Sequence, residues 1–384
     1  MKSLLVIAGE DSGDMHAADV IAALKEKRSD LSFWGIGGDK LRAAGVETLH
    51  DTQEMDVLGF AEVLAKYSFF KSVFDEVLAE VDKRKPDAAL LIDYPGFNLR
   101  LAKELKQRGV KVLYYVCPQV WAWNRGRIPK MAKIIDRLMV IFPFEVEVFN
   151  AVDLKVDFVG HPMVDELRAF RETEPAPIPW TGEKKIALLP GSRKQEIRYI
   201  LSPLLEAAQL MEESRSDVSF VIPVPERRIA WVEEILQKAK KAPRNISIVV
   251  GKSREVLKQA DAAFVASGTA TLEAALLGCP TVLVYKTSGF NYAIGRMLIK
   301  IPWLGIANVI SGKEIMPERI QQRMRPIELV ATMDPLMNNT PARTAMLENF
   351  QTLEKELGAG SPAARIAEII SAEIVYRSTN FVGI

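Results

Sequence analysis

The chain of 384 residues is long enough for two domains of ordinary size, and its 50 lysines and arginines balance 49 acidic residues. That balance gives no indication of general nucleic-acid binding. Two cysteines, Cys117 and Cys279, are too few and too far apart for a disulfide framework or a zinc knuckle, which fits a reducing compartment. The amino end reads as a strand rather than a signal peptide, and no apolar run approaches the roughly 18 residues of a membrane span, so we expect a cytoplasmic protein.

The first half of the chain alternates short, continuously apolar runs with segments of helical period. Continuously apolar runs are typical of parallel strands that are buried on both faces. The strands predicted here are Leu4–Ala8, Phe33–Ile36, Ala88–Ile92, Val112–Val116 and Leu138–Phe142. Three prolines within Thr173–Gly182 then interrupt every period, and they predict a linker.

A second alternating series follows the linker. Its predicted strands are Ile186–Leu189, Val218–Ile222, Ile246–Val250, Ala262–Val265 and Val282–Tyr285. The pattern predicts an α/β protein of two doubly wound, Rossmann-like domains that face a cleft. We expect an N-terminal domain over 1–172, a linker over 173–184, a C-terminal domain over 185–358 and a C-terminal helical segment over 359–384.

Three loops that leave predicted strands of the first domain carry polar residues. Gly9–Asp14 combines two glycines with three acids, but it is not GxGxxG, so a dinucleotide site is disfavoured; the alternative is a tight turn before a helix. Asp93 directly follows a buried strand, where partial desolvation would raise its pKa and suit a general base. The alternative for Asp93 is a helix-starting residue, which Pro95 and Gly96 argue against because the chain turns there.

The third of these loops, Cys117–Arg127, holds two tryptophans and two arginines. Arg125 and Arg127 could grip a phosphate, or they could be solvated arginines on a loop that serves only packing. His161 could act as an acid or base, although a lone histidine is more often structural. The three histidines of the chain lie far apart in sequence, so we expect no metal site.

In the second domain, the turn Ser267–Ala270 lies between a predicted strand and a predicted helix. Its small residues let backbone N–H groups approach a ligand, and a helix N-terminus favours an anion. A nucleotide-sugar would place its diphosphate there and its ribose against Glu273; alternatively, Glu273 only complements the helix dipole. Arg193 follows another strand and can form a forked contact with a diphosphate, on a loop that we expect to precede a helix starting at Ser202-Pro203.

The segment from Phe60 to Val81 is more apolar than a globular protein requires. Apolar residues follow helical spacing, extra aromatic residues widen the stripe, and Lys66 and Lys71 flank it. Core packing is one explanation, and an interfacial surface that meets anionic lipid is the other. A second segment, Tyr292–Leu304, also mixes apolar and cationic residues. The candidate membrane-facing residues are Leu64, Tyr67, Phe69, Phe70, Val73 and Phe74.

Together these motifs resemble the lipid-A-disaccharide synthase family, which are inverting glycosyltransferases of the two-domain GT-B type. The resemblance runs through nearly the whole chain. It rests on Gly9–Asp14, Ile92–Asn98, Pro118–Trp123, Gly160–His161, Leu189–Arg193, Ala266–Glu273 and Asn308–Gly312 with Glu314. The family usually has Thr where this chain has Asp11 and an acid where it has Gly96, which discourages assigning roles to positions 11 and 96.

The resemblance implies that UDP-2,3-diacylglucosamine reacts with 2,3-diacylglucosamine 1-phosphate (lipid X) to give a β-1′,6-linked disaccharide 1-phosphate and UDP. Asp93 would take the proton from the acceptor 6-hydroxyl as that oxygen attacks the anomeric carbon, with no covalent enzyme intermediate. Neither a metal nor another cofactor is expected. The residues implied for the donor are Arg193, Ser267, Gly268, Thr269 and Glu273. The candidates for the acceptor are Ser12, Arg125 and Arg127.

The implied partners are the two lipid substrates and an anionic lipid surface on the inner face of the inner membrane, with no nucleic acid. The C-terminal helix, over Ala363–Ile374, would cross back to the N-terminal domain within one subunit or in a homodimer. Two other classes stay open at this point. One is a UDP-N-acetylhexosamine 2-epimerase or another GT-B transferase that uses a UDP-sugar, and the other is a non-catalytic, nucleotide-regulated membrane-binding protein.

Overall fold

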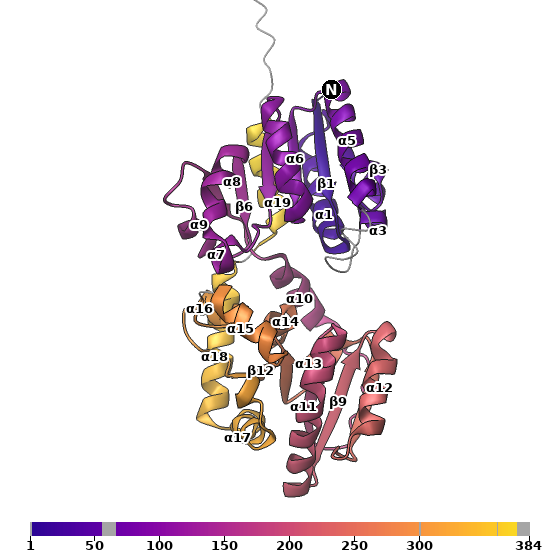
Figure 1. Cartoon of the computed structure of the whole chain (residues 1–384), viewed down its shortest axis with the longest axis vertical. Helices are drawn as coiled ribbons and strands as arrows, with labels where there is room; N and C mark the ends of the chain where they lie inside the picture. Colours follow the sequence, from indigo (N-terminus) through magenta and orange to yellow (C-terminus); the bar gives the residue numbers. More distant parts are fainter. Residues whose placement is uncertain (1, 56–66, 299–300, 359, 375–384) are drawn as a thin grey trace, which may run out of the picture. The chain divides into compact units, whose positions relative to one another are not determined.

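The computed structural model describes residues 2–55, 67–298, 301–358 and 360–374, and the chain divides into two compact units (Figure 1). The first unit comprises Met1–Pro162 and Gly358–Ile384, and the second comprises Met163–Leu357. Each unit is built around one parallel sheet, so the predicted α/β class with two doubly wound, Rossmann-like domains is confirmed. None of the helices in the described ranges combines the length and apolarity that crossing a membrane needs.

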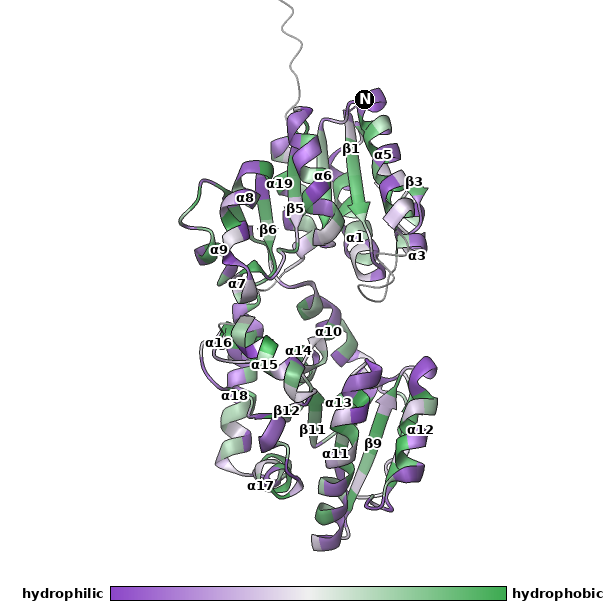
Figure 2. Ribbon diagram, in the orientation of Figure 1, coloured by the Kyte–Doolittle hydropathy of each residue, from purple (hydrophilic) through white to green (hydrophobic). Residues whose placement is uncertain are grey.

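The first unit contains a seven-stranded parallel sheet in the order β3-β2-β1-β4-β5-β6-β7. The strands are β1 (Lys2–Ala8), β2 (Leu31–Ile36), β3 (Glu47–His50), β4 (Ala88–Ile92), β5 (Lys111–Tyr115), β6 (Arg137–Val140) and β7 (Lys155–Phe158). All five strands predicted for this half are confirmed, and β3 and β7 add a strand at each edge. In Figure 2, β1 is largely hydrophobic, while the helices beside it alternate hydrophobic and hydrophilic residues.

The two faces of this sheet are covered by different helices. The helices of the unit are α1 (Asp11–Lys27), α2 (Asp39–Ala43), α3 (Thr52–Met55), α5 (Tyr67–Arg84), α6 (Pro95–Gln107), α7 (Val120–Trp123), the 3-10 turn η1 (Arg125–Arg127), α8 (Ile128–Ile134), α9 (Glu145–Val148) and α19 (Pro362–Glu373). Leu5 and Ile7 of β1 face a core shared with α5 and α6. Leu4 and Val6 alternate with them and face a core shared with α1 and α19.

The second unit contains a six-stranded parallel sheet in the order β10-β9-β8-β11-β12-β13. Its strands are β8 (Lys184–Leu189), β9 (Val218–Val224), β10 (Ile246–Val250), β11 (Ala262–Ala266), β12 (Thr281–Tyr285) and β13 (Glu318–Ile320). Its helices are α10 (Pro162–Glu172), α11 (Lys194–Ser214), η2 (Glu226–Arg228), α12 (Ile229–Lys238), α13 (Ser253–Gln259), α14 (Thr269–Leu276), α15 (Gly289–Leu298), α16 (Ile306–Ser311), η3 (Gln321–Arg323), α17 (Pro326–Met337) and α18 (Pro341–Glu356). The five predicted strands are confirmed, and β13 is an additional edge strand.

The boundary between the units lies earlier than the sequence predicts. The first unit ends at Pro162 rather than at residue 172, because polar contacts fasten α10 to the second unit. Glu166 accepts a hydrogen bond from Arg254, and the Lys258 ammonium donates to the carbonyl oxygen of Phe170. The predicted linker over 173–184 also belongs to the second unit, where Trp180 packs against the core.

Helix α19 belongs to the first unit and packs against α1. Ile366, Ala367 and Ile370 are fully buried in the core that α1 shares with the sheet. The carboxylate of Glu373 accepts hydrogen bonds from Lys111 and Arg137 on neighbouring strands, at 2.7 and 2.9 Å. Apolar burial and these ion pairs together fix the last described helix on the first unit.

Candidate functional site

Asp93 lies directly beyond the carboxyl end of β4, in a backbone conformation that the surrounding structure holds in place. Asp93 and Tyr94 have φ values of 43° and 48°, and two consecutive left-handed residues other than glycine are uncommon. The Asp93 N–H donates to the carbonyl oxygen of Tyr115 at 2.9 Å. The Asp93 carbonyl oxygen accepts from the Tyr114 hydroxyl at 2.6 Å and from the Asn98 amide at 2.8 Å. These buried partners orient a carboxylate at the edge of the sheet where α/β proteins bind ligands.

Burial raises the pKa of Asp93 from its usual 3.8 to about 6. The negative charge of Glu10 raises this pKa further, and a hydrogen bond from the Tyr94 N–H opposes both effects. The increase that the sequence predicts is therefore present, with desolvation as its main cause. A carboxylate with this pKa is ionised at neutral pH and can still accept a proton, as a general base must.

The loop after β1 lies against the Asp93 turn. A Cβ atom at Gly9 would come within 2.5 Å of the Tyr94 ring, so only glycine lets that ring lie on this backbone. The Asp14 carboxylate is buried and accepts hydrogen bonds from the backbone N–H groups of Gly38, Lys40 and Leu41. Asp14 therefore holds a neighbouring loop, whereas Ser12 is exposed in the first turn of α1.

The tryptophan and arginine loop divides into a buried part and an exposed part. Trp121 is buried, and its indole N–H donates to the Glu145 carboxylate at 3.0 Å. Trp123 is 51% exposed, and the Arg127 guanidinium lies 5.3 Å from its ring centroid. Arg125 is exposed, and its Nε–H donates to the Trp121 carbonyl oxygen at 3.4 Å. The loop therefore contains a buried side chain that serves packing, Trp121, and an exposed cation, Arg125.

Glu145 is a functional candidate that the sequence did not single out. Its carboxylate is 1% exposed and also accepts a hydrogen bond from the Phe142 N–H. Burial raises the pKa of Glu145 from 4.5 to about 8, although its hydrogen bonds to Trp121 and to the backbone act in the opposite direction. An acid between apolar residues in Pro143–Val148 is the only sequence signal that could have pointed to it.

The predicted membrane-facing residues do not share one environment. Val73 is 1% exposed and packs in the core beneath α5, so its assignment to a membrane-facing surface is wrong. Tyr67 is 60% exposed, while Phe69, Phe70 and Phe74 are half-buried against the same core. Leu64 lies outside the described residues. The helical period brings Val73 to the inner side of α5, where it joins Val77 and Val81.

His161 is buried beside the ring of Phe142, with ring centroids 5.4 Å apart. Burial lowers the pKa of His161 to about 4, and the charge of His16 lowers it further. His161 is therefore neutral at physiological pH.

In the second unit, the predicted phosphate-binding turn follows β11 and begins α14. Gly268 is the N-cap residue of this helix, with φ of 152°, and as a glycine it has no side chain to cap the first turn. β8 pairs with β11 in parallel, with Leu189 opposite Val265, so the loops that follow the two strands leave the same sheet edge. A Cβ atom at Gly191 would lie 3.4 Å from the Ala266 side chain. The structure therefore brings the Arg193 loop and the Ser267 turn together.

Arg193 lies at the start of a helix, whereas the sequence predicts that it lies on a loop well before one. α11 begins at Lys194 and contains Pro203 in its interior, so the helix does not start at Ser202 and Arg193 is its N-cap residue. The N–H groups of Ser192 and Arg193 donate to the Glu196 carboxylate. The Arg193 side chain is 81% exposed and pairs with Glu196 at 2.8 Å. Surface ion pairs of this kind are weak enough for an anionic ligand to replace.

Glu273 lies in an ion-pair network that the sequence did not indicate. Arg254 donates through Nε to Glu273 at 2.9 Å and through a terminal nitrogen to Glu166 at 2.7 Å. Neither of the two explanations offered for Glu273 included this cation. Glu273 is the fifth residue of α14, so it does not lie in the first turn as the helix-dipole explanation requires. Because Arg254 holds one carboxylate oxygen of Glu273, it orients that side chain.

Buried Glu318 and Asn308 hold the loop that follows the second apolar segment. Glu318 accepts the backbone N–H groups of Leu304 and Gly305, and Asn308 donates to the same carboxylate. The Ser267 hydroxyl donates to the Leu304 carbonyl oxygen at 3.5 Å. This network links Asn308, part of the motif Asn308–Gly312, through Glu318 and Leu304 to the predicted phosphate-binding turn.

Comparison with known proteins adds the following relationships. The family model described as "Lipid-A-disaccharide synthetase" matches residues 4–369. The lipid-A-disaccharide synthase of Syntrophus aciditrophicus is 38% identical over 371 residues, covering 95% of this chain and 96% of that protein. The corresponding protein of Myxococcus xanthus is also 38% identical, over 377 residues and 96% of each chain.

Two solved structures share the fold at low sequence identity. The kitacinnamycin glycotransferase aligns with a TM-score of 0.64 at 14% identity, covering 97% of this chain and 98% of that chain. A UDP-N-acetylglucosamine 2-epimerase aligns with a TM-score of 0.61 at 12% identity, covering 96% and 95%. At such identity these likenesses show the architecture alone.

Proposed function

This chain belongs to the lipid-A-disaccharide synthase family, and from that premise we propose how its residues carry out the reaction. The chain is a glycosyltransferase that joins UDP-2,3-diacylglucosamine to 2,3-diacylglucosamine 1-phosphate, releasing UDP. The epimerase alternative has support only from fold neighbours at 12% to 15% sequence identity.

Asp93 is the general base of the transfer. Its carboxylate takes the proton of the acceptor 6-hydroxyl while that oxygen forms a bond to the anomeric carbon of the donor. The bond from the anomeric carbon to the diphosphate breaks on the opposite face, which inverts the centre and releases UDP. The observation that carries this assignment is an oriented carboxylate at a strand end whose pKa burial raises to about 6.

The donor diphosphate binds at the start of α14. Backbone N–H groups of the turn Ser267–Thr269 and the positive end of the helix favour the diphosphate, and the N-cap residue Gly268 has no side chain that could cap the first turn. The exposed Arg193 side chain exchanges its partner Glu196 for a phosphate oxygen. Glu273, oriented by Arg254, accepts a hydrogen bond from a ribose hydroxyl.

The acceptor phosphate binds on the first unit. Arg125 and Arg127 are the cations that the tryptophan loop presents, and Ser12 lies exposed at the start of α1. Trp123 supports the Arg127 guanidinium from one side, which reduces the freedom lost when the arginine binds an anion.

The exposed side of α5 lies on an anionic lipid surface at the inner face of the inner membrane. Tyr67 and Lys71 are exposed there, with Phe69, Phe70 and Phe74 half-buried beside them. An aromatic ring next to a lysine is a typical pairing at the boundary between lipid headgroups and acyl chains. A homodimer through the C-terminal region is a further proposal, in which α19 would pack on the first unit of a second copy as it packs here on its own.

The experiment is a turnover assay of Asp93→Ala with both lipid substrates, together with UDP binding. We expect turnover to fall by about 10²-fold or more, the usual size for loss of a general base, while UDP affinity is retained. Unchanged turnover would remove Asp93 from the reaction.

A further inference from the structure

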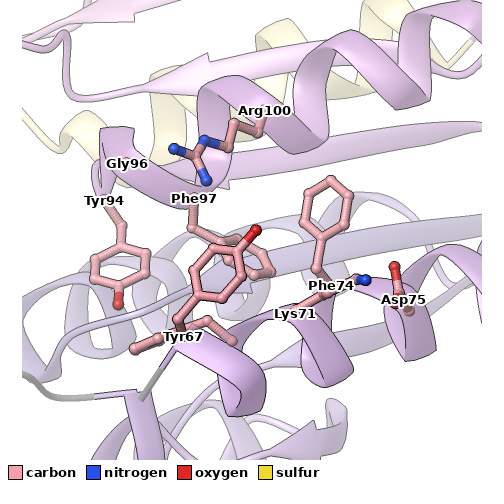
Figure 3. Close-up of a pocket in the computed structure, with 9 residues that line it drawn as sticks. Tyr67, Lys71, Phe74, Asp75, Tyr94, Gly96, Phe97 and Arg100 are labelled. Carbon is pink, nitrogen blue, oxygen red and sulfur yellow. The ribbon is translucent and has the colours of Figure 1, made fainter. Parts of the chain in front are cut away.

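A pocket of about 510 Å³ lies between α5 and α6 of the first unit (Figure 3). This volume falls within the range of small-molecule binding sites. Five aromatic rings dominate its lining, and α5 contributes from one side and α6 with its N-cap residue from the other. The lining residues are Tyr67, Phe70, Lys71, Phe74, Asp75, Tyr94, Gly96, Phe97 and Arg100.

One of the lining residues, Tyr94, directly follows the proposed base in the sequence. Tyr94 follows Asp93, and the left-handed conformation of both residues directs the Tyr94 ring into the lining. The Tyr94 hydroxyl donates to the Met55 carbonyl oxygen at 3.0 Å, and the ring lies on Gly9. Figure 3 shows Tyr94 beside Gly96 and Phe97 at the same side of the pocket. Tyr94 therefore connects the Asp93 turn to the lining of the pocket.

The charges of the lining favour an anionic amphiphile. Lys71 and Arg100 contribute two cations, and Asp75 contributes one acid. Neither cation forms a hydrogen bond or ion pair with another residue in the described ranges of the chain. Apolar rings with cations beside them complement an acyl chain attached to a negatively charged headgroup.

We propose that this pocket binds one acyl chain of the acceptor, and that its depth sets the acyl-chain length the enzyme prefers. The proposal rests on the function proposed above, because it places the acceptor hydroxyl at Asp93. The 6-hydroxyl of the acceptor and its acyl groups lie on different sides of the sugar ring. A hydroxyl at Asp93 therefore leaves an acyl chain free to run past Tyr94 between the helices.

Gly96 offers a way to test the pocket without disturbing its surroundings. It is the second residue of α6, and a Cβ atom there would meet no heavy atom within 4 Å. Gly96→Leu therefore fills pocket space, and Gly96→Ala fills less of it in case the larger variant fails to fold. The matched control is Gly289→Leu, the same change at an exposed helix start in the second unit that also has nothing within 4 Å.

The experiment measures equilibrium binding of 2,3-diacylglucosamine 1-phosphates with acyl chains of increasing length. It is run in the Asp93→Asn background, so the readout does not depend on catalysis. Without a Gly96 change, affinity should rise by about fourfold for each added methylene until the pocket is full, and then level off. Gly96→Leu should bring that plateau to a shorter chain, Gly96→Ala should bring it to an intermediate length, and Gly289→Leu should leave it in place.

Affinity that changes by the same factor at every chain length, or not at all, in both Gly96 variants would overturn the proposal. A plateau that moves equally in Gly289→Leu would overturn it too, because the effect would not belong to the pocket. Failure of the base assignment is a separate result: Asp93→Asn would then turn over substrate, while the chain-length series in the Gly96 variants would still report on the pocket.

Discussion

Replacing Asp93 by Asn should make the protein more stable and nearly inactive. Asn has almost the same shape as Asp, accepts hydrogen bonds through its amide oxygen, and tolerates the left-handed conformation with φ of 43°. It cannot take a proton from the acceptor hydroxyl. The variant therefore distinguishes the effect of the buried charge on the free energy of unfolding from its role in taking the proton of the acceptor.

The size of the stability gain follows from the pKa of Asp93. Folding raises this pKa from 3.8 to about 6, so the folded protein binds the proton more tightly than the unfolded chain does. A raised carboxyl pKa destabilises the folded state above pH 6, by about 3 kcal/mol for a shift of this size. The cost shrinks as the pH falls from 6 towards 3.8, where both states are protonated. Asp93→Asn removes the cost at every pH.

The assay is urea unfolding of the wild type and Asp93→Asn in parallel at several pH values. We expect the variant to be more stable by up to about 3 kcal/mol at pH 7.5, with the difference decreasing below pH 6. Turnover of the wild type should fall on the same acid limb, because the base is protonated there. An Asn variant that is less stable at pH 7.5, or a difference that does not change with pH, would refute the reasoning from desolvation.

Three further predictions concern residues around the two proposed substrate sites. Arg254→Gln should raise the KM for the UDP-sugar by about tenfold, because Glu273 loses the cation that orients it; an unchanged KM in steady-state kinetics would show that this ion pair is only structural. The pKa of about 8 for Glu145 means that wild-type stability falls as the pH rises from 4.5 to 8, since only the unfolded chain ionises there. Glu145→Gln should flatten that dependence in urea unfolding, and parallel curves for the two proteins would contradict the burial argument. Tyr67→Ser should weaken sedimentation with anionic vesicles at an unchanged melting temperature, whereas Val73→Ser should lower the free energy of unfolding by about 2 kcal/mol; the reverse pattern would exchange the surface and core assignments.

The interior of each sheet was predictable from the sequence, whereas the sheet edges were not. Central strands such as β4 are buried on both faces and therefore appear as unbroken apolar runs. Edge strands β3 and β7 are short and at most half-buried, so polar residues interrupt any recognisable run. The division between the units was also misplaced, because ion pairs that hold α10 on the second unit join residues far apart in the chain.

For the candidate site, the sequence indicated where the site residues lie along the chain, but it did not indicate which side chains they contact. Asp93 and the Ser267 turn each follow an apolar strand, and each lies at the carboxyl edge of the parallel sheet of its own unit, where α/β proteins bind ligands. The pairing of Glu273 with Arg254 depends on how α13 packs beside α14, which no local pattern records. The inner placement of Val73 likewise depends on which side of α5 meets the sheet.

The most direct test of the account is an assay of the purified chain with radiolabelled UDP-2,3-diacylglucosamine, with and without 2,3-diacylglucosamine 1-phosphate. The account predicts that disaccharide 1-phosphate and UDP form in equal amounts, and only when both lipids are present. Consumption of the UDP-sugar without the acceptor, or UDP release without disaccharide, would contradict it.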